Sequence, residues 1–190
     1  MKTLLFKRLW MVLILVVLAP RFAEAEESPM HGRIIPVPVV VKSPDRLRIQ
    51  ARDAHLAYEW QAMSTLTSWA VASIATGTML WATGGDRYTQ AVGIQNVAWG
   101  AIDGVIAGFG YRGIRKQSVL DKPVSYWTAR DRKTRKIFLI NAGLDVLYIA
   151  GGAALMGLGK SDFVKGSGAG VILQGSFLLL FDGAMGVAIR

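Results

Sequence analysis

Residues 93–111, GIQNVAWGAIDGVIAGFGY, decide which fold this chain is expected to adopt. The stretch is apolar and about as long as the ~20 residues that a helix needs to cross a bilayer. It nevertheless carries two amides, Gln95 and Asn96, and one acid, Asp103. Asn96 and Asp103 lie seven residues apart, so a helix places them on one face. Polar groups inside a span normally face other helices rather than lipid, and we therefore predict a helix bundle within the membrane.

Two later stretches repeat this combination of an amide followed by an acid. Residues 137–158 carry Asn141 and Asp145, and residues 168–189 carry Gln174 and Asp182. No lysine or arginine lies well inside these spans to neutralise the acids, so the acids must face the bundle interior, pair with donors or be protonated. The predicted intramembrane polar network comprises Gln95, Asn96, Asp103, Asn141, Asp145, Gln174 and Asp182.

Small residues indicate where the helices approach one another. Gly100, Gly104 and Gly108 recur every four residues, and Gly77 lies within a small-residue face of the preceding span. Bare backbone at this spacing allows close contact between membrane helices. We predict that these four glycines are helix-packing positions.

The expected fold is all-α, a four-helix transmembrane bundle preceded by an amphipathic interfacial helix. The four-span domain covers residues 65–190, with spans at about 66–83, 91–111, 137–158 and 168–189. Trp69 and Trp81 fall near the ends of the first span, as interfacial anchors do.

The N-terminal part of the chain has three expected segments. Residues 1–25 resemble a signal peptide, with a basic start, a short apolar core and an Ala-Glu-Ala cleavage pattern; an uncleaved anchor is the alternative. Residues 26–42 form an extended tail broken by prolines. Residues 43–64 form the amphipathic helix, which has Ser43 as its N-cap.

The basic residues give a second, conflicting indication of topology. A cleaved signal followed by four spans places the basic segment 112–136 outside the cytoplasm, whereas the positive-inside rule places it inside. Both indications put the N-terminal tail, this segment and the C-terminus on one side of the membrane. The expected location is the bacterial inner membrane, as a multi-pass protein. The expected partner is the lipid bilayer, with anionic lipids at residues 112–136.

The composition restricts the chemistry that this chain can perform. There are no cysteines, and the two histidines, His31 and His55, lie outside the spans, so we predict no metal and no cofactor. The net charge of +9 resides in the loops, and no aromatic-basic interleaving indicates a nucleic-acid partner. No catalytic triad, phosphate-binding loop or dinucleotide motif is present, so the chain is not expected to be an enzyme.

Three roles for the buried acids remain open at this point. The first is a hydrogen-bond network that holds the bundle together in a non-enzymatic envelope protein. The second is a small solute or proton transporter, or a channel-like protein, that uses the acids. The third, an intramembrane aspartyl hydrolase, would need two facing acids such as Asp103 and Asp145. The equal spacing of Gln95 and Asp103, and of Gln174 and Asp182, also raises the hypothesis of a two-plus-two helix duplication.

Several short motifs resemble an uncharacterised family of bacterial membrane proteins with a signal peptide and four helices. They are Trp69-Ala70 followed by Ile74 and Gly77, the run from Asn141 to Asp145, and Leu173-Gln174-Gly175 followed by Phe181-Asp182. The resemblance covers about residues 45–188. Asp103 departs from it, since an amide such as Asn is expected there. The resemblance implies the four-helix fold and assigns no activity.

Overall fold

The computed structural model describes residues 43–189 of the chain, and this part consists of helices with no strand. The predicted signal peptide 1–25 and extended tail 26–42 lie outside the described residues. The four helices are α2 (Pro44–Thr83), α3 (Arg87–Ser118), α4 (Val124–Leu158) and α5 (Asp162–Ala188). The all-α prediction is therefore confirmed for this range.

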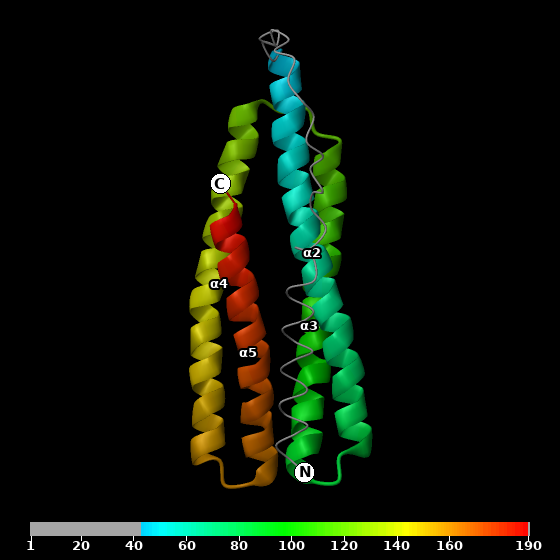
Figure 1. Ribbon diagram of the computed structural model, residues 1–190, viewed down its shortest axis with the longest axis vertical. Coiled ribbons are helices and arrows are strands. Elements are labelled where there is room, and N and C mark those ends of the chain that lie inside the picture. The colour runs from blue at the N-terminus through cyan, green and yellow to red at the C-terminus, as the bar shows by residue number, and fades with distance from the viewer. Residues whose placement is uncertain (1–42, 190) are drawn as a thin grey trace, which may run out of the picture. The chain divides into compact units, whose positions relative to one another are not determined.

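The helices are arranged as two antiparallel hairpins (Figure 1). α2 packs along α3, α4 packs along α5, and α3 joins the hairpins by packing against α5. α5 ends below the upper ends of α2, α3 and α4 in Figure 1, so the upper section of the bundle contains three helices and the lower section four.

Side-chain caps determine where three of the helices begin. Ser43 precedes Pro44, and its hydroxyl accepts a hydrogen bond from the Arg46 amide at 3.4 Å. Asp86 accepts from the Thr89 amide at 2.8 Å, and Ser161 accepts from the Val164 amide at 3.3 Å. Each cap satisfies an amide that has no partner within its helix.

Glycines bring the two helices of each hairpin into close contact. A Cβ atom at Gly77 would lie 2.7 Å from the Gly93 carbonyl oxygen, and one at Gly100 would lie 2.8 Å from that of Ala70. In the second hairpin, Cβ atoms at Gly152 and Gly168 would lie 2.8 and 2.5 Å from each other's carbonyl oxygens. Larger residues at these four positions would force the backbones apart.

Two predicted segments belong to longer helices. The amphipathic segment 43–64 runs directly into the first predicted span, because α2 continues without interruption for 40 residues. The basic segment 112–136 is largely helical: α3 extends to Ser118, α4 begins at Val124, and only residues 119–123 connect them. The charged ends of α3 and α4 contact the first half of α2 through Gln117 and Asp131.

The predicted four spans are not all supported by apolar composition. Among the described helices, α4 and α5 are long and apolar enough to cross a membrane, with mean hydropathies of 1.6 and 1.7 in their most apolar windows. α2 and α3 do not reach this composition, because the uncharged half of α2 is rich in serine and threonine, and α3 is rich in glycine and also carries amides and an acid. The structure therefore supports two candidate spans within a four-helix fold.

Candidate functional sites

Gln174 on α5 lies at the centre of a hydrogen-bond network that joins three helices. Its side chain is fully buried. Its Nε2 donates to Asn96 Oδ1 on α3 at 2.6 Å and to Ser73 Oγ on α2 at 3.2 Å, while its Oε1 accepts from Trp69 Nε1 at 2.7 Å. Asn96 in turn donates to the Val92 carbonyl at 2.9 Å. We call Trp69, Ser73, Asn96 and Gln174 the amide network.

Trp69 was predicted to be an interfacial anchor, but the structure places it inside the bundle. It is 6% exposed and stacks on Phe177 with ring centroids 3.9 Å apart. Its indole N–H reaches Gln174, which explains how a tryptophan is accommodated in an apolar interior. By contrast, Trp81 is 55% exposed near the end of α2.

The three predicted acids come together inside the bundle, one each from α3, α4 and α5. Asp103, Asp145 and Asp182 are all buried, and each is within electrostatic range of another. Asp103 interacts electrostatically with both Asp145 and Asp182, and these two acids also interact with each other. One oxygen of Asp103 and one of Asp145 have no hydrogen-bond partner in the described part of the chain.

The remaining predicted positions contribute less to this interior. Gln95 lies against α5, where a Cβ at Gly170 would meet the Gln95 side chain. Asn141 is half-buried, and no hydrogen bond joins Gln95 or Asn141 to the amide network within residues 43–189. Gly108 was predicted to pack but has open space around it, and Gly104 makes only an ordinary contact, with Ala70 at 3.8 Å. The tight backbone contact at Gly100 therefore does not extend to Gly104 and Gly108.

A second polar cluster, which the sequence did not predict, surrounds His55 in the three-helix upper section. His55 is 1% exposed. Its Nδ1 lies 2.6 Å from Asp131 Oδ1 on α4, and its Nε2 lies 3.1 Å from Glu59 Oε1 and 3.2 Å from Gln117 Oε1 on α3. Gln117 Nε2 donates to Glu59 Oε2 at 2.8 Å, which closes the cluster. We call His55, Glu59, Gln117 and Asp131 the histidine cluster.

The partners of His55 define its protonation state. All three partner atoms are oxygens that accept, so both ring nitrogens donate and the ring is an imidazolium. Burial lowers the pKa of His55, but the hydrogen bonds and charges of Glu59 and Asp131 raise it by more, leaving the pKa above its ordinary value of 6.5. Burial raises the pKa of Glu59, but hydrogen bonds from His55 and Gln117 and the nearby positive charges bring it below its ordinary value of 4.5.

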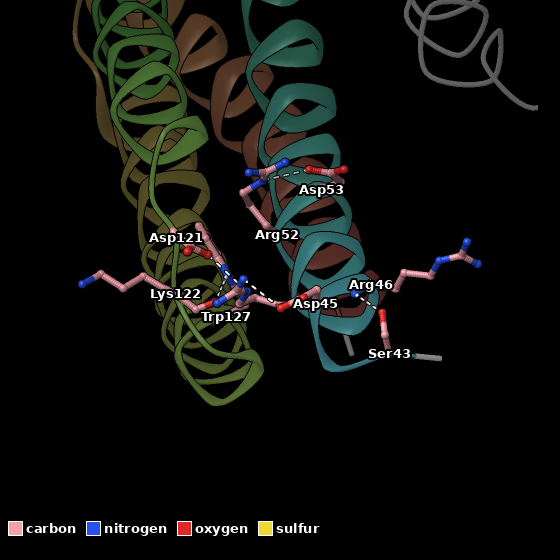
Figure 2. Close-up of polar contacts among 9 residues, drawn as sticks. Ser43, Asp45, Arg46, Arg52, Asp53, Asp121, Lys122 and Trp127 are labelled. Carbon is pink, nitrogen blue, oxygen red and sulfur yellow. Dashed lines mark hydrogen bonds and ion pairs between the residues drawn. The ribbon is translucent and has the colours of Figure 1, made fainter. Parts of the chain in front are cut away.

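The end of the upper section closes over the histidine cluster. Trp127 is 1% exposed, and its ring lies against His55 with centroids 5.5 Å apart. Figure 2 shows Trp127 beside Lys122, whose carbonyl accepts from the indole Nε1 at 3.3 Å. Arg48 of α2 pairs with Asp121 at 3.1 Å, which ties the first turns of α2 to the α3–α4 connection. These contacts exclude water from the buried imidazolium.

Tyr58 lies between the histidine cluster and the three acids. Its hydroxyl donates to the Met185 carbonyl near the end of α5. Burial first, and then the charges of Asp182, Asp131 and Glu59, raise the pKa of its phenol. Tyr58 therefore interacts electrostatically with Asp182 of the acid cluster and with Asp131 and Glu59 of the histidine cluster. It lies at the level where the upper section of the bundle meets the four-helix section.

Neither the three acids nor the histidine cluster has the donor arrangement of a metal centre. Within residues 43–189, no group of three or more His, Cys, Asp or Glu side chains could hold a metal ion. The carboxylates of the histidine cluster instead contact a protonated ring, which offers a metal no lone pair.

The chain was compared with known protein families, curated proteins and solved structures. A family of unknown function, DUF6992, matches residues 65–183. The chain belongs to this family. The DUF6992 region includes the whole amide network and the three acids, but it begins after His55 and Glu59. No curated protein and no solved structure matches the chain.

The histidine cluster was missed because its residues are far apart in the sequence. The one local signal is the i, i+4 spacing of His55 and Glu59, which is equally typical of an exposed helix face. Asp131 lies in a run of basic residues and Gln117 near the end of α3, and neither local sequence indicates a contact with His55. The hydrogen bond that Ser73 accepts from Gln174 likewise joins residues that are far apart in the sequence.

Proposed function

We propose that this chain is a non-enzymatic, multi-pass membrane protein in which all four helices cross the bilayer and the amide network holds the bundle together. The observation that carries the proposal is the combination of polar side chains inside the bundle with large apolar side chains on its outside. A water-soluble protein shows the reverse arrangement.

The outer faces of the helices support the membrane location. On α4 only a few residues are buried, and large apolar side chains such as Leu144, Val146 and Leu147 are 45–65% exposed. On α3, Ile102, Val105 and Phe109 are at least half exposed. In water, such a continuous apolar surface would exceed the few hundred Å² that soluble monomers tolerate.

Membrane helices that lie in lipid gain little hydrophobic free energy from packing on one another. Their association depends on close packing at small residues and on interhelical hydrogen bonds. The glycine contacts within each hairpin provide the close packing. Gln174 provides the interhelical hydrogen bonds, which join α5 to α2 and α3. The amide network therefore selects one register for the two hairpins.

The cellular location belongs to the same proposal. The resemblance to bacterial membrane proteins and the signal-like residues 1–25 favour the bacterial inner membrane. The exposed basic residues around the α3–α4 connection favour contact with anionic headgroups.

Single-cysteine labelling tests the four-span arrangement, because the chain has no native cysteine. Gly85→Cys and Lys160→Cys mark the two lower turns, and Lys122→Cys marks the upper connection; all three positions are exposed. We expect a membrane-impermeant thiol reagent on intact cells to label either the two lower positions or the upper one. Labelling of one lower turn together with Lys122→Cys would contradict four spans. The identity of the labelled set also decides between the signal peptide and the positive-inside rule.

The acid cluster favours a second candidate function, a proton-conducting or small-solute transport protein. Asp103, Asp145 and Asp182 lie close together in the bundle interior, and Asp103 and Asp145 each retain a buried oxygen without a hydrogen-bond partner among the described residues. A purely structural network would be expected to satisfy these oxygens.

Reconstituted vesicles with an internal pH dye separate the two functions. If the acids carry protons, the wild-type protein dissipates an imposed pH gradient and Asp182→Asn abolishes this flux while keeping its fold. If wild-type and protein-free vesicles behave alike, the acids act only in packing. Asp162→Asn, an exposed acid at the start of the same helix, is the matched control.

A further inference from the structure

A pocket of about 330 Å³ opens between α2, α3 and α4 at the lower edge of the histidine cluster. Its upper wall is polar and its lower wall apolar. The polar wall is formed by Glu59, Gln117, Arg130 and Lys133. The apolar wall includes Ala62, Met63, Ile137 and Phe138. One pocket therefore spans the level at which the charged section of the bundle becomes apolar.

Arg130 is a cation without a hydrogen-bond partner at this pocket. Its Nε is buried and has no hydrogen-bond acceptor, and residues 43–189 provide it with no ion pair within 4.0 Å. The acid on the same wall, Glu59, is already engaged: Oε1 contacts His55 and Oε2 accepts from Gln117. Arg130 acts on Glu59 through its charge, but no carboxylate among the described residues lies within ion-pair distance of its guanidinium group, whose N–H groups can therefore bind an anion.

Lys133 adds a second positive charge to the same wall. It lies three residues after Arg130 on α4, so both side chains are on one face of the helix. The two carboxylates Glu59 and Asp131 face three cations, His55, Arg130 and Lys133, so a net positive charge remains beside the pocket. An arginine that can form two parallel hydrogen bonds beside a lysine is a common arrangement for recognising phosphate.

The apolar wall indicates that the anion is attached to a hydrocarbon chain. Ile137 and Phe138 directly follow the basic run of α4, and Met63 faces them from α2 in the same pocket. A free inorganic anion would leave this wall without a partner. A molecule with a phosphate at one end and an acyl chain at the other would contact both walls.

We propose that this pocket binds an anionic phospholipid, with its phosphate on Arg130 and Lys133 and the start of an acyl chain against Met63 and Phe138. The inference rests on the proposed membrane location. Basic pockets between membrane helices at the headgroup level are suited to such lipids.

Titration of the purified full-length protein in mild detergent tests the proposal. Native mass spectrometry would count bound phosphatidylglycerol and phosphatidylcholine, and thermal unfolding would report the stabilisation that each lipid confers. We expect the wild type to prefer phosphatidylglycerol. Arg130→Gln combined with Lys133→Gln should weaken phosphatidylglycerol binding by about tenfold or more, since charge-assisted hydrogen bonds are lost.

A second variant tests the volume of the pocket without changing its charge. Gly113 lines the pocket, and a Cβ there would meet only the Gln117 side chain, at 3.9 Å. Gly113→Leu should fill the pocket and reduce lipid binding while α3 remains folded. The control for charge is Arg132→Gln with Arg135→Gln, which removes two exposed charges from the same helix but none from the pocket.

The outcomes separate this inference from the proposed function. Equal loss of binding in the control pair would mean general surface attraction and would overturn the pocket assignment. Stabilisation by inorganic phosphate equal to that by phosphatidylglycerol would overturn the lipid in favour of a free anion. Failure of the protein to behave as an integral membrane protein on alkaline extraction would sink the proposed function itself, whereas an integral protein without lipid preference would sink only the inference.

Discussion

The Gln174 side chain has no exposed surface and uses both its oxygen and its nitrogen on neighbouring helices. Because Gln174 is fully buried, no water replaces these partners, and each hydrogen bond fixes the relative position of two helices. Individual bonds of this kind average only ~0.6 kcal/mol, with the strongest near ~1.7. Because Gln174 makes three such bonds, its replacement should change the free energy of unfolding by a measurable amount.

Replacing Gln174 by Leu should destabilise the protein by about 1–3 kcal/mol, because Asn96 and Trp69 are left with unpaired polar atoms. Unfolding in mixed detergent and dodecyl sulfate measures the change. Leu180→Ala, at a position 59% exposed on α5, is the control and should have little effect. Equal stability of Gln174→Leu and the wild type would show that the network does not stabilise the bundle.

The histidine cluster should make stability depend on pH. The folded pKa of His55 is raised, so its stabilisation is complete below the ordinary value of 6.5 and is lost as the pH rises through the folded pKa. The folded pKa of Glu59 is lowered, so its stabilisation is present above 4.5 and is lost as the pH falls through the folded pKa. We expect the Tm difference between wild type and His55→Gln to be largest between these two values.

Nuclear magnetic resonance of labelled histidine provides a direct check of this linkage. His31→Gln leaves His55 as the single histidine of the chain. Its ring resonances should titrate above pH 6.5. Titration at or below that value would contradict the assigned ion pairs with Glu59 and Asp131.

At the scale of elements, glycines on one helix differ in what they contact. A Cβ at Gly100 would lie 2.8 Å from the Ala70 carbonyl of α2, whereas a Cβ at Gly108 would meet nothing within 4 Å. The four-residue repeat therefore does not mark one continuous packing face. Because the backbone of α2 approaches α3 near Gly77, Gly93 and Gly100, that region controls the spacing of the first hairpin.

The pair Gly100→Ala and Gly108→Ala tests this difference with the same chemical change. Gly100→Ala should cost about 1–3 kcal/mol, since the backbones must separate. Gly108→Ala should be neutral or stabilising by up to about 1 kcal/mol, because alanine favours helix more than glycine. Unfolding free energies compare the two, and equal destabilisation would mean that α2 and α3 do not pack as described.

At the scale of the described bundle, the amide network, the histidine cluster and Tyr58 all provide contacts between the two hairpins. Gln174 joins α5 to α3, His55 joins α2 to α4, and Tyr58 joins α2 to the end of α5. The covalent connection between the hairpins, residues 119–123, is mostly exposed. The hairpins should therefore remain together without it.

Cleavage at an engineered protease site between Val119 and Leu120 tests this expectation. Val119 is 81% exposed, so the insertion disturbs little packing. The cut halves of the purified protein should elute together in mild detergent, and Gln174→Leu should promote their separation. Immediate separation of the unmutated halves would show that the covalent connection 119–123, rather than the amide network and the histidine cluster, holds the hairpins together.

Much of the amide network and the acid cluster could be predicted from polar residues inside apolar stretches. Asn96, Asp103, Asp145, Gln174 and Asp182 are all buried, as expected for polar groups that lie between packed apolar helices. The partners were less predictable. Trp69 has the amphipathic ring of an interfacial anchor, and only its distance to Gln174 shows that it is inside.

The sequence by itself determined the helical class, the four helices and the polar side chains that they carry, because apolar runs, caps and glycine turns are local signals. The tertiary structure alone decided that the charged half of α2 packs against α3 and α4 and buries His55 between two carboxylates. It also decided which glycines allow close approach and that Arg130 lines a pocket in which Glu59 is already bound to His55 and Gln117. These features join residues as far apart as His55 and Asp131, which are separated by 76 positions, and no local pattern encodes such distances.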